Sequence, residues 1–434
     1  MLTRIEFDAS HDEEFFAALP ATPAVFVLRP NRAGAEPYVS KTVNLGRRLR
    51  RLLSAAEGRR LSLRERASAV EWCEVGGDFE AGFALYRLLR AEFPEKYAER
   101  LHLRPAPLLQ LLRDNPYPRV AVTSRIRSLR SGSVYFGPFA SRAEAEQYAN
   151  DSLDFFLLRR CVEELAPDPK FPGCVYSEMK MCLAPCFKGC SDERYAEESA
   201  RVERYLESGG HSLVVEISRA RDEASAQLEF EAAAASHARL EKLKAVQSRI
   251  AEIVHRIDRL NGLLLQPSHR PGHISLFRIS GGMLHGPIAF DLRARGLNRA
   301  KQAKEAQAEG TASQNVASQS HIRQKMADVG HPGLASPGVI TQSMEARINE
   351  LLSTAEPARP KSAQEWMEHL AILKRWYYRT NKVGEIFFED EHGALPMRRV
   401  VRAVGRVFKG EKPAGDLSET AGDYWIFRSK EAGL

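Results

Sequence analysis

The stretch FFLLRRCVEELAPDPKFPGCVYSEMKMCLAPCFKGC, residues 155–190, holds five of the six cysteines in the 434-residue chain. The spacing C-x12-C-x7-C-x3-C relates four of them, Cys161, Cys174, Cys182 and Cys186, and Cys190 trails behind. Four thiolates brought together by such spacing can ligate an iron–sulfur cluster or a zinc ion. The Leu-Ala-Pro before Cys186 stiffens the last loop, because proline fixes its own φ and restrains the preceding residue.

Three interpretations of the cysteines compete. A disulfide framework is disfavoured, because nothing in the sequence marks the chain as secreted and cytosolic thiols stay reduced. Structural zinc sites usually show two C-x2-4-C pairs, whereas the stretch from Cys182 to Cys186 is the one clear pair in this segment. The spacing alone therefore leaves zinc and iron–sulfur equally open.

The composition is that of a soluble globular protein, with 44% hydrophobic and 27% charged residues. The length predicts two to four domains, and the net charge of +7 is compatible with anionic partners. No apolar run approaches the roughly 18 residues of a membrane span, and the acidic N-terminus MLTRIEFDASHDEEFF lacks a secretory apolar region. We therefore expect a cytoplasmic protein with no membrane association.

Upstream of the cysteines, residues 24–29 and 37–40 read as two short strands of a hairpin. A helix is predicted from about residue 43, with four leucines on one face and four arginines on the other. Between Lys41 and Arg66 the sequence has nine basic and two acidic residues, a local excess equal to that of the whole chain. So dense a run favours contact with a nucleic-acid backbone over a merely solvated face. The candidate DNA-binding residues are Arg47, Arg50, Arg51, Arg59 and Arg60.

Between the two regions, residues 115–126 (NPYPRVAVTSRI) contain a strand, and YFGPF follows at residues 135–139. Ser141 can cap a helix that runs from about residue 142 to 158, with Glu144 completing a capping box. YFGPF, this helix, LRRC and CLAPC together resemble the middle of the UvrC family, the excinuclease ABC nucleases of nucleotide excision repair. The resemblance implies a partner, damaged DNA, and a [4Fe–4S] cluster held by Cys161, Cys174, Cys182 and Cys186. It leaves Cys190 as a spare thiol.

The N-terminal region resembles the GIY-YIG nuclease motif of the same family. AVF, residues 24–26, stands for its first triplet and YVS, residues 38–40, for its second, so Ala24 and Ser40 replace both motif glycines. Phe26 replaces a tyrosine whose hydroxyl helps to activate water in the family, which makes it a degenerate catalytic position. The positions that match the motif are Tyr38, Lys41, Asn44, Leu45 and Arg48, of which Tyr38, Lys41 and Arg48 are the catalytic candidates.

The family also has a metal-binding glutamate on a later helix, here predicted over residues 83–101. One alignment, anchored at the start of the helix, places Arg87 at that position, and another, anchored on Pro94, places Leu85 there. Neither offers a carboxylate for the Mg²⁺ or Mn²⁺ that hydrolysis needs, and Glu80 and Glu92 lie outside the pattern. The resemblance thus implies at most a single-incision endonuclease. The alternative is a non-catalytic module with a degenerate nuclease fold that binds DNA or UvrB, the excinuclease protein with which UvrC proteins pair.

Residues 228–246 (LEFEAAAASHARLEKLKAV) resemble the UVR motif, a helical hairpin through which UvrC proteins pair with UvrB. The alternative is an ordinary helical hairpin whose apolar residues pack within the same chain. The resemblance covers residues 22–250, a little over half the chain. Beyond it we expect a β-hairpin around Gly281-Gly282, a flexible stretch at about 300–342, and then a helix, a strand and a helix. We find no RNase H-like or helix-hairpin-helix pattern.

The sequence therefore predicts an α+β multidomain protein. Its expected parts are a GIY-YIG-like α/β domain (1–103), a cysteine-rich helical Fe–S segment (104–200), a UVR-like helical hairpin (201–256) and an unassigned α+β region (257–434). A zinc-dependent nucleic-acid-binding protein unrelated to repair is a further alternative.

Overall fold

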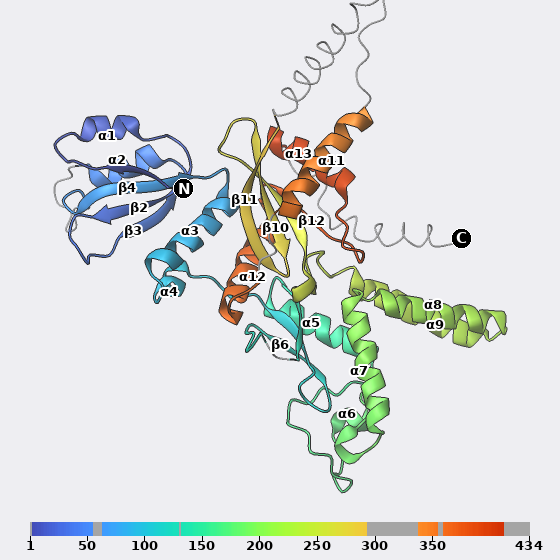
Figure 1. The fold of residues 1–434 in the computed structure, drawn as a ribbon. Coiled ribbons are helices and arrows are strands. Elements are labelled where there is room, and N and C mark those ends of the chain that lie inside the picture. Colours follow the sequence, from blue (N-terminus) through green and yellow to red (C-terminus); the bar gives the residue numbers. More distant parts are fainter. Residues whose placement is uncertain (1, 55–62, 130–131, 293–336, 355–358, 412–434) are drawn as a thin grey trace, which may run out of the picture.

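The computed structural model describes residues 2–54, 63–129, 132–292, 337–354 and 359–411, with the backbone alone over 337–343. The described chain forms three four-stranded sheets, and their strand pairs are antiparallel. In Figure 1 the N-terminal sheet lies at one end, the C-terminal sheet at the centre and the middle sheet below it. This is a mixed α+β architecture, as predicted. No described helix is long and apolar enough to cross a membrane.

Residues 3–74 build the first sheet and its first two helices. The elements are β1 (Thr3–Glu6), α1 (Asp12–Ala18), β2 (Ala24–Pro30), β3 (Tyr38–Thr42), α2 (Leu45–Leu53) and β4 (Ala67–Glu74). The strand order is β1-β4-β2-β3, and residues 24–28 of β2 are buried because helices cover both faces of the sheet. The predicted hairpin and the helix after it are confirmed. The elements β1, α1 and β4 were not predicted.

Helix α3 (Asp78–Glu92) covers the second face of this sheet, where Ala81 packs against Val25 and Val75. The single helix predicted over residues 83–101 is instead two helices, α3 and α4 (Tyr97–Leu101). The break falls at Pro94, because proline has no N–H to donate and disfavours a helical conformation at the residue before it.

The middle sheet has the order β6-β5-β7-β8. Its strands and covering helix are β5 (Leu108–Leu112), β6 (Arg119–Thr123), β7 (Val134–Gly137), α5 (Arg142–Leu153) and β8 (His255–Arg256). The Ser141 hydroxyl accepts the N–H of Glu144 at 3.1 Å, which confirms the predicted start of α5. The helix ends earlier than predicted, because Phe155 and Phe156 turn into the core instead.

The cysteine segment is mostly loop. It contains one short helix, α6 (Val175–Glu178), and a 3₁₀ turn over Pro185–Phe187. It then enters helix α7 (Asp192–Glu207), which packs on the same core as α5. The segment hangs at the lower end of the molecule, beside α7 (Figure 1). Long loops of this kind have few ways to bury apolar surface, so another interaction must order them.

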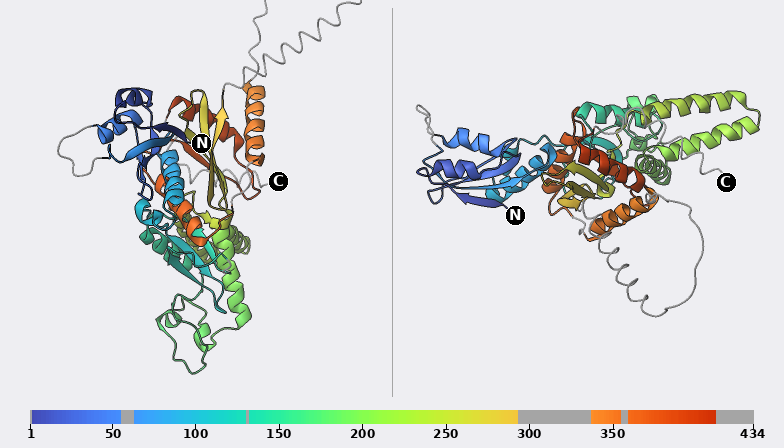
Figure 2. Two further views of the ribbon diagram at one scale, coloured as in Figure 1. Left: turned by 60° about the vertical axis from the view of Figure 1, so that its left-hand side comes forward. Right: turned by 90° about the horizontal axis from the view of Figure 1, so that it is seen from above.

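Helices α8 (His211–Ala226) and α9 (Phe230–Gln247) form an antiparallel hairpin. Both helices lie within residues 201–256, the range predicted for a helical hairpin, and the quoted stretch 228–246 supplies the turn and most of the second arm. Leu228, with φ of 60°, makes the turn. Figure 2 shows the hairpin reaching away from the three sheets.

The C-terminal sheet has the order β11-β10-β9-β12. Its elements are β9 (Gly262–Pro267), β10 (His273–Ser280), β11 (Met283–Asp291), α11 (Pro337–Thr354), α12 (Ala363–Tyr377), β12 (Glu385–Phe388) and α13 (Met397–Lys409). The hairpin around Gly281-Gly282, the helix from residue 363, the strand at 385 and the last helix are confirmed. Most of the stretch predicted to be flexible, about 300–342, lies outside the described residues, and α11 begins within it at residue 337.

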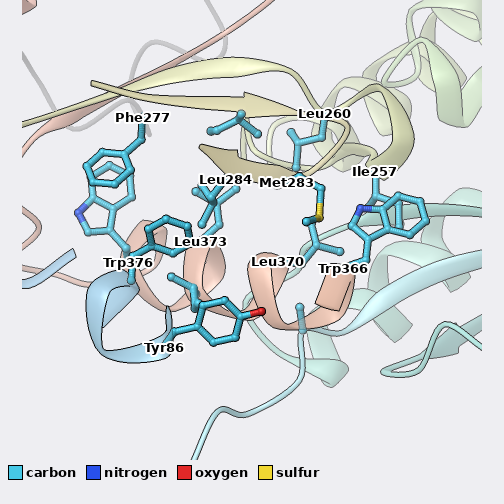
Figure 3. Packing of buried hydrophobic residues seen from close by; sticks show 14 of the residues in the cluster. Tyr86, Ile257, Leu260, Phe277, Met283, Leu284, Trp366, Leu370, Leu373 and Trp376 are labelled. Atoms are coloured by element: carbon cyan, nitrogen blue, oxygen red, sulfur yellow. The ribbon is translucent and has the colours of Figure 1, made fainter. Parts of the chain in front are cut away.

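One large core joins the three sheets. Helix α12 lies between β10–β11 and helix α3, with Leu370 and Leu373 fully buried (Figure 3). The far side of α3 also enters this core through Phe83 and Tyr86, and the middle sheet through Tyr135. The apolar packing is therefore continuous across residue 103, the predicted boundary between the first two domains.

Candidate nucleic-acid interface and cysteine centre

Tyr38 and Arg48 are brought together by the turn from β3 into α2. Asn44 caps the helix, since its side chain accepts the N–H of Arg47 at 2.8 Å, and this fixes where the arginines point. The Arg48 guanidinium donates to the Tyr38 hydroxyl at 3.2 Å. Phe26 lies beneath, fully buried, with its ring centroid 6.1 Å from that of Tyr38. The structure thus assembles three of the four catalytic candidates.

Lys41 lies elsewhere. It is three positions from Tyr38 on the same strand, and side chains an odd number of positions apart leave a strand from opposite faces. Its ammonium group is 2.6 Å from a carboxylate oxygen of Asp78, in the first turn of α3. Asp78 also pairs with Arg379, just beyond α12. Burial tends to raise the pKa of Asp78, but the hydrogen bonds and charges of Lys41 and Arg379 outweigh it and lower that pKa.

The two glutamates near the expected metal position are engaged elsewhere. Glu80 is buried and accepts the N–H of Gly76 at 3.0 Å and the Ser275 hydroxyl at 3.3 Å. Burial raises the pKa of Glu80. Its hydrogen bond with Ser275 links α3 to the C-terminal sheet. Glu92 binds the Arg29 guanidinium through both oxygens, at 2.6 and 2.8 Å. Neither glutamate is hydrogen-bonded to Tyr38, Lys41 or Arg48 in the described structure.

Arg87, which the preferred alignment places at the metal position, does not line the hollow that holds Lys41. Arg87 is exposed and reaches the carbonyl of Gly286 in the C-terminal sheet, at 3.5 Å. It lies nine residues after Asp78, half a turn away on the opposite side of α3. Leu85, the residue of the other alignment, lines the same hollow as Lys41 and Asp78. The position beside Lys41 therefore holds a leucine. Asp78, which starts the same helical face two turns earlier, was not recognised from the sequence.

The predicted DNA-binding arginines fall into two groups. Arg47, Arg50 and Arg51 are exposed on α2, and the Arg50 guanidinium lies 5.4 Å from the ring centre of Phe16. Arg59 and Arg60 lie outside the described residues. Arg64, counted in the basic run, is half-buried and tied to Asp12 at 2.7 Å, so it serves the fold. Arg47, Arg50 and Arg51 are therefore accessible from solvent on α2.

Beside Tyr38 the surface is hollowed to a volume of about 420 Å³. Arg29, Arg32 and Arg66 contribute three cations to the wall of this hollow, and Glu36 contributes a carboxylate. Arg29 is neutralised by Glu71 and Glu92. The hydrogen bonds to Glu92 and Glu71 hold the pKa of Arg29 above its usual value. No ion pair in the described residues neutralises Arg32 or Arg66, so these two cations could attract an anion to the hollow.

The four predicted cysteine ligands are half-buried and influence one another. Burial raises the pKa of the Cys182 thiol; the Ala184 N–H lowers it, and Cys174, Cys186 and Cys161 add to the rise. The pKa of the Cys190 thiol is also raised, by burial and then by the charge of Asp192, while Arg194 opposes the rise. None of the four predicted ligands contributes to this shift. No group of three or more His, Cys, Asp or Glu side chains in the described residues is already arranged as a direct metal site.

The surroundings of Cys161 suit an anionic centre. Arg159 is 1% exposed, yet no described carboxylate pairs with it. Its guanidinium donates to the carbonyls of Tyr117 and Glu163, each at 2.9 Å, and to the Cys161 sulfur at 3.5 Å, while its Nη2 atom has no partner. The Ala184 N–H donates to the Cys182 sulfur at 3.4 Å. A buried cation with a spare donor and N–H···S bonds fit thiolates that carry negative charge on a metal.

The tip of the α8–α9 hairpin exposes large apolar side chains. Leu228, in the turn, and Phe230, at the start of α9, are 70% and 69% exposed. Neighbouring apolar side chains left in water are typical of a surface that another molecule covers.

Residues 106–205, which include β5, β6, β7, the cysteine segment and most of α7, match the family described as "UvrC/Cho excinuclease, middle domain". The UvrABC system protein C of Leptospira biflexa is 28% identical over 293 residues, covering 64% of this chain and 45% of that protein. The proteins of the same name from Haloarcula marismortui and Moorella thermoacetica are 28% and 27% identical. They match 52% and 54% of this chain, and 39% and 37% of their own lengths. No solved structure matches the chain.

The chain is therefore a divergent relative of the UvrC family. It spans less than half the length of these curated relatives. The similarity to the Leptospira protein covers 64% of the chain, more than the stretch of residues 22–250 whose motifs carry the resemblance.

Proposed function

We propose that this chain is a UvrC-like protein of nucleotide excision repair that binds damaged DNA and does not cut it. The relationship to the UvrC family and the exposed arginines of α2 support the DNA-binding part. The N-terminal unit would then act as a phosphate-binding module built on a nuclease-like plan.

The position of the carboxylates is the observation that supports a protein that does not cut DNA. Hydrolysis of a phosphodiester needs oxygen ligands for a divalent cation and a group that orients water. In the described residues no carboxylate is hydrogen-bonded or ion-paired with Tyr38 or Arg48. Asp78, beside Lys41, is already shared between two cations. Phe26 has no hydroxyl and so cannot orient water as the tyrosine of the family motif does.

The proposal includes a cysteine-held cofactor, a [4Fe–4S] cluster with zinc as the alternative. Cys161, Cys174, Cys182 and Cys186 would hold it: the other three thiols lie close enough to raise the pKa of Cys182, and the uncompensated Arg159 supplies positive charge beside them. Such a centre would order the long loop between α5 and α7, because metal binding to a loop contributes directly to its folding.

The proposal also includes docking to UvrB. The α8–α9 hairpin is the candidate surface, because its tip presents Leu228 and Phe230 to solvent. An apolar helical tip suits a matching helical hairpin on the partner.

Two measurements on the full chain test this function. Affinity for a duplex with a bulky lesion should fall steeply with salt, and replacing Arg47, Arg50 and Arg51 with Ala should weaken binding to every sequence alike. Unchanged affinity in that variant would show that the arginines of α2 are only solvated and do not contact DNA. Incision of the same duplex should stay at background with Mg²⁺ or Mn²⁺, even with UvrA and UvrB present. Robust cutting that Tyr38→Phe abolishes would instead establish a single-incision endonuclease.

A further inference from the structure

Where the N-terminal unit meets α12, the surface has a small hollow of about 60 Å³. Lys41 and Asp78 reach it from β3 and α3, and Arg375 and Arg379 reach it from the last turn of α12 and just beyond. Gly82 lies between them, and nothing occupies the space where a Cβ atom would stand. The hollow therefore combines residues from opposite ends of the chain.

The charges around this hollow are unequal. Lys41 is 2.6 Å from Asp78, and Arg379 binds the other oxygen of the same carboxylate. Arg375 is exposed and has no hydrogen-bond or ion-pair partner among the described residues. Three cations therefore surround one carboxylate. Lys41, Asp78 and Arg379 keep 37%, 52% and 50% of their side chains exposed, so the cluster remains open to solvent.

The two arginines are held in place by the core beneath them. Trp376 between them is 4% exposed, stacks edge-on against Phe79 of α3 at 5.8 Å, and donates to the carbonyl of Val383 at 3.1 Å. Arg375 lies in the last turn of α12 and Arg379 lies beyond the end of the helix, and both side chains line the same hollow. Figure 3 shows Trp376 and Leu373 packed at this end of α12. The core therefore fixes the backbone that carries the two arginines, while their side chains stay exposed to solvent.

We propose that Lys41, Arg375 and Arg379 form a binding site for a backbone phosphate of DNA, and that Asp78 occupies this site as an internal counter-anion which the phosphate displaces. This inference rests on the proposed DNA-binding function. It gives the C-terminal unit, to which the family resemblance assigns no role, a direct part in holding DNA. It also explains why Lys41 faces away from Tyr38: it serves a second phosphate, beyond the one nearest α2.

The site and a purely structural latch predict opposite effects when the carboxylate is removed. If Asp78 competes with phosphate, then Asp78→Asn frees two cations and tightens DNA binding. If Asp78 merely fastens α12 to α3, the same change loosens the junction and does not tighten binding. The sign of the change therefore separates the two roles.

The experiment measures fluorescence anisotropy of a labelled duplex with the full chain over a range of salt concentrations. Arg375→Gln with Arg379→Gln should weaken binding about tenfold and reduce the salt slope by about 1, since the site holds one phosphate and each phosphate contact contributes about 0.9. Asp78→Asn should strengthen binding several-fold. Circular dichroism of each variant verifies that the fold is kept.

Matched controls remove the same charges from other surfaces. Arg142→Gln with Arg219→Gln takes two exposed, carboxylate-paired arginines from α5 and α8, and Asp222→Asn takes one arginine-paired carboxylate from α8. If the DNA affinities of these folded controls change as much as those of the site variants, the proposed phosphate site is wrong. Wild-type affinity in the Arg375 and Arg379 double variant would also show that it is wrong. A wild-type chain that binds no DNA would instead overturn the proposed function itself.

Discussion

Arg159 shows how much of this molecule depends on single side chains. The sequence LRRC places two arginines before Cys161, and nothing in the pattern distinguishes them. In the structure Arg159 is buried without a carboxylate, whereas Arg160 pairs with Asp154 at 2.8 Å. Burial, and then the charge of Arg159, also lower the pKa of Arg119. Positive charge is therefore concentrated beside Cys161, where a metal–thiolate centre would supply the opposite charge.

The first prediction concerns the ligands. Anaerobically purified protein should contain about four iron atoms per chain and little zinc. Cys182→Ser should lose the metal, because it removes one of four thiolates, while Cys190→Ser should keep it. Metal analysis and the visible absorption spectrum measure both effects. Colourless protein with one zinc ion per chain would contradict the cluster and leave the zinc alternative.

The second prediction concerns the buried guanidinium. Arg159→Gln should speed the loss of metal in air, because the thiolates lose a nearby positive charge and an N–H donor. Arg160→Gln is the matched control, since it changes the neighbouring residue of the same type. The measurement is the time course of bleaching of the visible absorption. Equal rates for the two variants would show that Arg159 is only a packing residue.

At the scale of the element, the sequence predicted best what is local. The hairpin β2–β3, helix α2 and the cap at Ser141 follow from side-chain periodicity and capping chemistry, which act within a few residues. The break at Pro94 was missed because the apolar periodicity continues across it. The placement of Asp78 beside Arg379 could not be predicted, since those residues are brought together by packing between distant helices.

The third prediction concerns the α8–α9 hairpin. Leu228→Asn with Phe230→Ser should reduce affinity for UvrB at least about tenfold, because central apolar contacts dominate such interfaces. Asparagine tolerates the positive φ at position 228, so the turn should survive. The control, Val43→Ser with Val383→Ser, changes two exposed apolar residues on other surfaces. Surface plasmon resonance with immobilised UvrB gives the affinities, and equal losses in both variants would argue against the hairpin tip.

At the scale of the molecule, the units are held together by the core around α12. His369 lies in it, 6% exposed, between the rings of Phe83 and Tyr86, and its Nδ1 atom accepts the N–H of Leu284 at 2.9 Å. Burial lowers the pKa of His369 from 6.5 to about 4; Arg90 and His285 add to the drop, and Glu365 opposes it. The neutral ring is therefore part of the packing.

The fourth prediction follows from that pKa. Between pH 6.5 and about 4 the unfolded chain binds a proton that the folded core refuses, so stability is full above this window and falls as the pH drops through it. The loss should reach about 2 kcal/mol at about pH 5. His369→Gln keeps an acceptor for Leu284 and should remove this part of the pH dependence. Urea unfolding followed by the fluorescence of Trp366 and Trp376 reports it, and an unchanged slope in the variant would exclude His369 as the cause.

Helix α3 belongs to two cores at once, the N-terminal sheet on one side and the shared core on the other. A segment ending near residue 103 could not be exchanged between proteins as a self-contained cassette, because Phe79, Phe83 and Tyr86 would be left in water. Substitutions on one side of this helix are constrained by the N-terminal sheet, and those on the other by α12 and β10. A gene fusion that replaced either the N-terminal unit or the C-terminal unit would therefore have to repack α3.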